Sequence, residues 1–287
     1  MRVKGIMKII CLLFINIMIL SLFFGKDLVF FITLGILLYG WLGEYIALMK
    51  DHAIKLDKLS PFEQVKLAHA RNCLIQDVQA KSGYDISKFN FYMIRSDDLN
   101  AYSYGVNSIA ITQGLLQSVD DLTLNAILAH ELSHAFHLDA LFNRIIFADI
   151  TICLLILSAV SFLSMFMIWF IFIIVGSFSI FSYFLTSGIS KFVKGMIVFL
   201  QRIVLFVYQT VLGAIQRHFE YRSDHYAVEL GYGHSLAYFL KIFILPNETN
   251  YKSISEILYN SHPATYKRIE RIENDISLQT HHLQKFI

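Results

Sequence analysis

The sequence predicts a mostly α-helical, multi-pass membrane protein whose spanning helices carry a domain of mixed α and β structure. Of its 287 residues, 56% are hydrophobic and only 16% are charged. This composition is too apolar for a soluble enzyme of this length and too charged for a bundle of membrane helices alone. The apolar residues also fall into long runs, which are separated by segments of soluble composition. The net charge of +2 does not indicate nucleic-acid binding, so we expect no nucleic-acid partner.

Residues 1–50 are predicted to form a two-helix transmembrane anchor. The apolar runs 9–24 and 28–49 are joined by the short turn Gly25-Lys26-Asp27. No small-residue cleavage site follows the first run, so we do not expect a cleaved signal peptide. Positive side chains precede the first run and follow the second: Arg2, Lys4, Lys8, Lys50, Lys55 and Lys58. Because positive charge favours the inner side of a membrane, the chain after residue 50 is expected in the cytoplasm.

Residues 51–140 are predicted to be the N-terminal part of a soluble domain. The segment Ser60-Pro61-Phe62-Glu63 has an N-cap, a first-turn proline and a capping-box glutamate, and the helix that it starts is expected to end near Gly83. Residues 89–94 are rich in aromatic side chains and predict a strand. A hairpin is predicted from 101–104 and 108–112, around Gly105-Val106-Asn107.

A second helix of this domain is predicted from Ser118 to about Asp139, because acidic residues occupy its first turn. Residues 141–215 are then predicted to be a transmembrane hairpin, and 216–287 the C-terminal part of the soluble domain. Two arrangements return the chain to the same side of the membrane. One has spans near 147–173 and 196–215. The other folds 145–187 into two spans and lays 196–215 along the membrane surface.

The peptide His130-Glu131-Leu132-Ser133-His134 lies on the predicted helix and has the spacing of a zinc site. Positions i and i+4 differ by only about 40° around a helix, so both imidazoles can bind one ion. Glu131 lies beside them and can reach a water molecule at the ion, as a general base requires. We therefore predict one zinc ion with His130 and His134 as ligands and Glu131 as a catalytic residue.

The third zinc ligand is expected from another segment of the chain. His137 shares the helix face, but it lies roughly 10 Å along the helix axis from His130, too far for both to bind one ion together with His134. We expect it to be a surface histidine or a neighbour of the site. The best source is 217–233, where Glu220 and Asp224 are again four residues apart. One carboxylate can bind zinc while the other accepts the N–H of a ligating histidine, and His218 and His225 are competing ligands.

Four short motifs resemble, in order and spacing, those of the HtpX-type and CAAX-protease-type family of membrane zinc metallopeptidases. They are NAYSYG at 100–105, HELSH at 130–134, EYRSD at 220–224 and SHP at 261–263. The resemblance implies a zincin-like α+β catalytic domain with a small β-hairpin or sheet. It also implies roles for single residues: Glu220 as the third zinc ligand, Asp224 as the partner of a ligating histidine, His262 as a catalytic stabiliser of the transition state, and Asn100 with Ala101 as substrate-binding residues.

These expectations together describe a membrane-anchored zinc metalloendopeptidase that hydrolyses peptide bonds at the cytoplasmic face of a bacterial cell membrane. Its expected partners are a protein or peptide substrate and the lipid bilayer. The resemblance allows membrane-protein quality control or CAAX-type processing, and the two N-terminal spans favour quality control. An intramembrane protease is disfavoured because the helix with HELSH begins with acidic residues after a soluble hairpin. A non-enzymatic zinc-binding membrane scaffold is disfavoured because it would have no use for Glu131.

Overall fold

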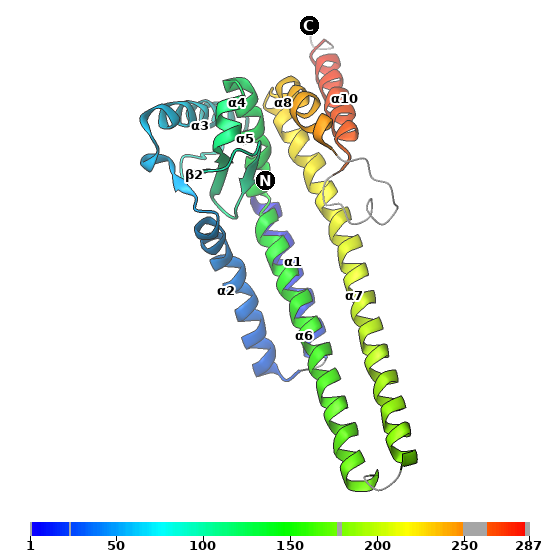
Figure 1. The fold of residues 1–287 in the computed structure, drawn as a ribbon. Helices are drawn as coiled ribbons and strands as arrows, with labels where there is room; N and C mark the ends of the chain where they lie inside the picture. The colour runs from blue at the N-terminus through cyan, green and yellow to red at the C-terminus, as the bar shows by residue number, and fades with distance from the viewer. Residues whose placement is uncertain (1, 23, 177–179, 249–262, 285–287) are drawn as a thin grey trace. The chain divides into compact units, whose positions relative to one another are not determined.

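The structure of the chain, a computed structural model, describes residues 2–22, 24–176, 180–248 and 263–284 (Figure 1). It is mostly helical and contains one small mixed sheet, as the sequence predicts. The chain divides into two compact units. Residues 1–145 and 213–287 form the first, and 146–212 form the second. The first unit therefore contains the two N-terminal apolar helices together with both segments of soluble composition.

Four helices within the described ranges are long and apolar enough to cross a membrane. Two of them, α1 (Arg2–Ser21) and α2 (Lys26–Lys50), correspond to the predicted anchor and pack against each other. The third, α6 (Asp139–Ile171), continues into a π-helical turn at Phe172–Gly176. The fourth, α7 (Ile180–Glu229), is one continuous helix. The arrangement with a separate surface helix at 196–215 is therefore wrong, because those residues lie inside α7.

The sheet has the strand order β1-β2-β4-β3, which places β3 at an edge. The predicted hairpin is present, since β3 and β4 are antiparallel with Ala101 opposite Ile111, and β2 runs parallel to β4. All five residues of β4 are buried, because β4 is the strand between β2 and β3. The strands are β1 (Ile54–Lys55), β2 (Asn90–Ile94), β3 (Ala101–Ser103) and β4 (Ser108–Thr112).

Helix α5 (Asp121–Phe136) is the central element of the soluble part and packs against β3, β4, α3 and α8. Its N-cap Asp120 accepts a hydrogen bond from the backbone N–H of Thr123. The helix ends earlier than the predicted Asp139, because Leu138 has a positive φ of 56° and breaks the helical path. The chain therefore turns sharply before α6 begins.

The remaining elements complete the soluble part. Helix α3 begins with the predicted capping box of Ser60 and Glu63 and ends at Gly83, whose φ is 69°. Helices α8 and α10 pack against each other. These elements are a 3-10 turn Leu56–Lys58, α3 (Pro61–Ser82), α4 (Gln113–Ser118), α8 (Gly233–Phe239), a π turn Leu240–Ile244, a 3-10 turn Leu245–Asn247 and α10 (Thr265–Gln284).

Candidate metal centre and substrate cleft

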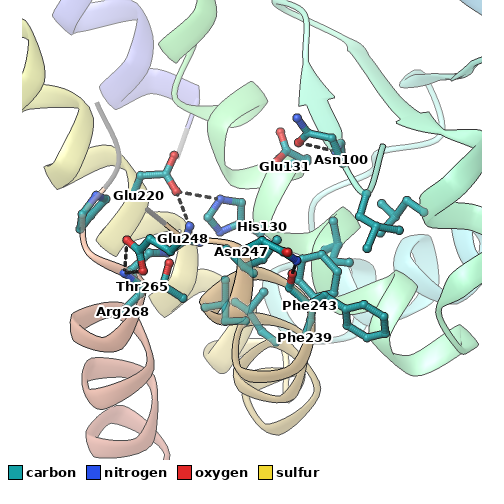
Figure 2. A pocket seen from close by; sticks show the side chains of 18 residues that line it. Asn100, His130, Glu131, Glu220, Phe239, Phe243, Asn247, Glu248, Thr265 and Arg268 are labelled. Carbon is teal, nitrogen blue, oxygen red and sulfur yellow. Dashed lines mark hydrogen bonds and ion pairs between the residues drawn. The ribbon is translucent and has the colours of Figure 1, made fainter. Parts of the chain in front are cut away.

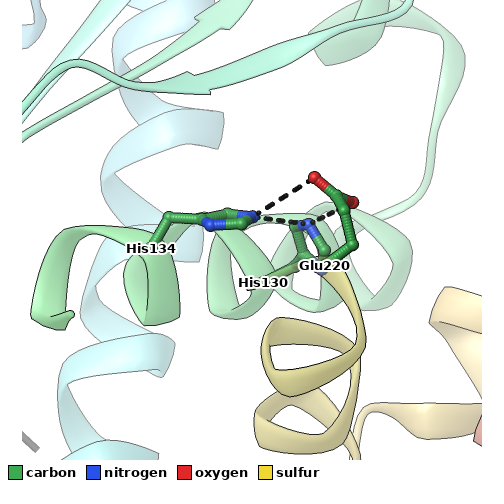
Figure 3. Close-up of side chains that lie close together, drawn as sticks. All are labelled: His130, His134 and Glu220. Atoms are coloured by element: carbon green, nitrogen blue, oxygen red, sulfur yellow. Dashed lines mark hydrogen bonds and ion pairs between the residues drawn. The ribbon is translucent and has the colours of Figure 1, made fainter. Parts of the chain in front are cut away.

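Three side chains from two helices converge on one point (Figure 3). The Nε2 atoms of His130 and His134, both on α5, are 3.2 Å apart. The carboxylate of Glu220 on α7 places one oxygen 3.5 Å from Nε2 of His130 and the other 3.6 Å from Nε2 of His134. Ligand atoms about 2.0–2.1 Å from a tetrahedral zinc ion lie about 3.3–3.4 Å from one another. These three separations therefore fit two imidazoles and one carboxylate around a single ion.

Both histidines have a carboxylate at the ring nitrogen that faces away from this point. Nδ1 of His130 lies 2.9 Å from Oδ1 of Asp224, and Nδ1 of His134 lies 2.9 Å from Oδ2 of Asp139. A carboxylate at Nδ1 favours the proton on that nitrogen and leaves the Nε2 lone pair for a metal ion. Asp224 thus has the geometry that the sequence resemblance implies, and Asp139 supplies the equivalent contact to the second histidine.

Cations balance the carboxylates around the three side chains. Arg268 of α10 donates two hydrogen bonds to Asp224, at 2.8 and 2.6 Å, and lies 3.0 Å from Glu220. Burial by itself lowers the pKa of Arg268, but the charges of Asp224 and Glu220 outweigh burial and raise it. Asp139 is contacted by Lys8 of α1, at 2.7 Å, and by Arg222 of α7. Each orienting carboxylate therefore has its own cationic partner.

The protonation of His130 is set by the same neighbours. Its side chain is buried, and burial lowers the pKa, but the hydrogen bonds and charges of Asp224 and Glu220 outweigh this effect and raise the pKa to about 10. A metal-free His130 therefore holds a proton at neutral pH. A metal ion must displace that proton when it binds, because it needs the Nε2 lone pair.

The other candidate histidines lie outside the converging group. His137 is buried, not at the surface, because Gly5 of α1 packs against its backbone. Its Nδ1 lies 2.8 Å from the carbonyl oxygen of Ser133, and burial together with the charge of Arg222 lowers its pKa to about 4. His225 is exposed and pairs with Asp275 at 2.8 Å. Neither His137 nor His225 belongs to the group of potential ligands found among the described residues.

A cavity of about 380 Å³ lies beside the converging side chains (Figure 2). Glu131 and Asn100 lie next to each other at its wall, together with Ala101 of the edge strand β3. Asn100 accepts the backbone N–H of Ala101 at 2.9 Å and donates to the hydroxyl of Tyr102 at 3.0 Å. The far wall is apolar and is formed by Leu115, Ile127, Leu236, Phe239, Leu240, Phe243 and Ile244. The expected catalytic residue His262 lies outside the described residues, although its neighbour Pro263 lines the cavity.

A known peptidase family matches most of the chain. The model of peptidase family M48 matches residues 66–276, a range that includes both histidines, Glu131 and Glu220. The chain belongs to peptidase family M48. Peptidases of this family depend on zinc, and His130, His134 and Glu220 form the group that could hold it. With its four long apolar helices, this family M48 chain is an integral membrane protein.

Individual relatives match shorter parts of the chain. Protease HtpX of Legionella pneumophila is 35% identical over 79 residues, which are 26% of this chain and 28% of that protein. The Protease HtpX homolog of Campylobacter curvus is 26% identical over 148 residues, which are 47% and 49% of the two chains. Among solved structures, S. mikatae Ste24p has a TM-score of 0.44 and 21% identity, and the match covers 69% of this chain and 49% of that one. The chain thus spans at most about half the length of these relatives.

Two residues beside the converging side chains, Asp139 and Arg268, are not predicted from the sequence. The sequence predicts Asp139 at the end of the helix that carries His134, which gives no reason to bring the two side chains together. Arg268 is one of several charged residues of α10, and its charged neighbours Lys267 and Arg271 give no reason to single it out. The signal for Asp139 is its distance of five residues from His134, which becomes informative only once the break at Leu138 is known.

Proposed function

We propose that this chain is a membrane-anchored zinc metalloendopeptidase that hydrolyses peptide bonds in protein substrates. The observation that carries the proposal is the convergence of His130, His134 and Glu220 on one point, with Glu131 at the wall of the adjoining cavity. A structural zinc site is normally closed by four protein ligands, whereas a catalytic site keeps a position open. Three ligands beside a cavity of about 380 Å³ are typical of the catalytic kind.

The proposed roles of the residues follow from their positions. A zinc ion bound here supplies polarisation of the scissile carbonyl and a water molecule of lowered pKa. Glu131 accepts the proton of the attacking water and passes it to the leaving amine. Asp224 and Asp139 keep the two imidazoles in the required tautomer and orientation. His262, for which the sequence resemblance implies a transition-state role, stays a prediction.

The substrate is proposed to bind in an extended conformation along β3. Among the described residues this strand lies at the edge of the sheet, where one side of its backbone can pair with another strand, and Ala101 lies at the cavity wall. The large apolar side chains of the far wall, Phe239 and Phe243 among them, suit apolar side chains of a substrate. Such side chains are common in membrane proteins, which favours a role in membrane-protein quality control over CAAX-type processing.

The proposed location is the cytoplasmic face of a bacterial cell membrane. Its support is the positive charge in the first two turns of α1 and at and after the end of α2, since Lys and Arg are enriched on the inner side of membranes. The named bacterial relatives are HtpX proteases, which agrees with this setting.

Replacing Glu131 by glutamine tests the proposal. The variant should lose about 10²–10⁴-fold in the rate of casein or membrane-protein cleavage, because the amide cannot take a proton, while it binds zinc as wild type does. The matched control is Glu270→Gln, which changes an exposed glutamate of α10. Cleavage at the wild-type rate by Glu131→Gln would remove Glu131 as the base. No cleavage by zinc-loaded wild type would favour the non-enzymatic scaffold.

A further inference from the structure

A second cavity, of about 420 Å³, lies where the start of α1 meets α7 and the end of α5. Its wall includes Lys4 and Lys8 of α1, His137 after α5, and His218 and Arg222 of α7. None of the three potential metal ligands lines it, and neither does Glu131. The proposed peptidase reaction gives this cavity no role.

The charges at this cavity do not balance. Lys8 and Arg222 share the single carboxylate of Asp139, which also faces His134. Lys4 is exposed and has no ion-pair partner within the part of the chain that the structure describes. Glu229, the acid at the cavity wall, lies 3.5 Å from His225. Three permanent cations, Lys4, Lys8 and Arg222, therefore stand against two carboxylates, Asp139 and Glu229, which leaves a net excess of one positive charge.

One donor group beside the cavity is also left unused. Nε of Arg222 is buried and has no hydrogen-bond acceptor among the described residues. The ammonium of Lys8 lies over the rings of Phe142 and Phe219, at 4.7 and 4.2 Å from the centroids, and is only partly exposed. A buried donor without an acceptor is costly, and one bound anion with several oxygens can accept from Arg222 while it adds a second counterion for Lys8.

The cavity adjoins the start of a helix that is apolar enough to cross a membrane. Lys4 and Lys8 lie in the first two turns of an apolar helix that is long enough to cross a bilayer. Between and beside them, Val3, Ile6 and Met7 are exposed large hydrophobic side chains. An anion that occupies the cavity is therefore adjacent to a surface that suits an acyl chain. This combination favours a lipid over a free inorganic ion.

We infer that this cavity binds the phosphate group of an anionic phospholipid, with Lys4, Lys8 and Arg222 as its donors. The acyl chains lie along the exposed apolar side chains at the start of α1. Because Asp139 pairs with two of these donors, the bound phosphate lies next to the carboxylate that orients His134. Lipid binding at this site does not depend on whether the chain cleaves peptides.

The test uses the full chain in a mild detergent, titrated with phosphatidylglycerol or with phosphatidylcholine of the same acyl chains, and measures bound lipid by native mass spectrometry. Wild type should prefer phosphatidylglycerol. One basic side chain near a membrane surface changes anionic-lipid affinity about fivefold, so Lys4→Gln should weaken phosphatidylglycerol binding about fivefold and Lys4→Gln/Lys8→Gln about 25-fold. The control Lys26→Gln, at the start of α2, should bind as wild type does.

Three outcomes would overturn the inference: equal binding of the two lipids, an unchanged affinity in Lys4→Gln, or an equal loss in Lys26→Gln. Displacement of phosphatidylglycerol by millimolar inorganic phosphate alone would also overturn it, because the site would then be one for a free anion. Lys4 is exposed, so Lys4→Gln stays informative even if the double variant does not fold.

Discussion

Replacing Asp139 by asparagine should weaken zinc binding by about 10- to 100-fold. The amide has the size of the carboxylate and its oxygen can still accept the N–H of His134, whose Nδ1 lies 2.9 Å from Asp139. It lacks the negative charge, however, so the hydrogen bond is weaker. The imidazole is then less firmly oriented and its Nε2 is less basic, and both changes reduce its affinity for zinc.

The same substitution should also lower the free energy of unfolding, because Lys8 and Arg222 lose their shared counterion. Removing one partner of a fully buried ion pair costs about 3–5 kcal/mol. Both cationic side chains are 23% exposed, so water compensates for part of the lost interaction. We therefore expect a loss of about 2 kcal/mol, below the range for fully buried pairs.

The assay is competition for zinc between the detergent-purified protein and a fluorescent chelator, with circular dichroism to verify folding. Arg222→Gln is the matched variant, because it removes a cation from Asp139 but leaves the contact with His134. It should lose stability with little change in zinc affinity. Asp57→Asn, at an exposed carboxylate, should change neither quantity. A folded Asp139→Asn variant with wild-type zinc affinity would refute the argument that this carboxylate acts through His134.

Two further outcomes are expected. Gly114→Ala should destabilise the fold by about 1–3 kcal/mol in thermal unfolding, because its Cβ would collide with the backbone carbonyl of Asp97, whereas Gly35→Ala, with open space around Gly35, should be nearly neutral. Between about pH 7 and 9 the apparent zinc affinity should rise about tenfold per pH unit. The reason is that zinc displaces a proton from His130, whose pKa is raised to about 10. An affinity that does not change with pH in chelator competition would contradict this. The protonated His130 also contributes to the stability of the metal-free fold. This contribution is complete below pH 6.5, the ordinary pKa of histidine, and is lost as the pH rises through about 10.

Local sequence signals were sufficient for much of the fold. The capping box at Ser60 and the glycine at Gly83 mark the two ends of α3, because both act through backbone groups only a few residues away. The hairpin of β3 and β4 and the two anchor helices follow from similarly local patterns. The pairing of His130 with His134 is also local, because one turn of helix separates them.

Contacts between distant segments could be predicted only where a motif resemblance supplied them. Spacing alone does not decide which residue of α7 is the third zinc ligand, because nothing in the sequence of α7 says which of its faces meets α5. The alternatives are Glu220, Asp224, His218 and His225. The packing of α7 against α5 brings Glu220 to both imidazoles and Asp224 to His130. His225 stays exposed and forms an ion pair with Asp275.

By itself, the sequence determined the helix that carries HELSH, the apolar helices on either side of it and the need for a third ligand from another segment of the chain. Only the tertiary structure decided which charges surround that site. The positive φ of Leu138 turns Asp139 back to His134, and the packing of α10 brings Arg268 to Asp224 and Glu220. Periodicity describes the faces of one element, whereas a hydrogen bond between two elements depends on how both are packed.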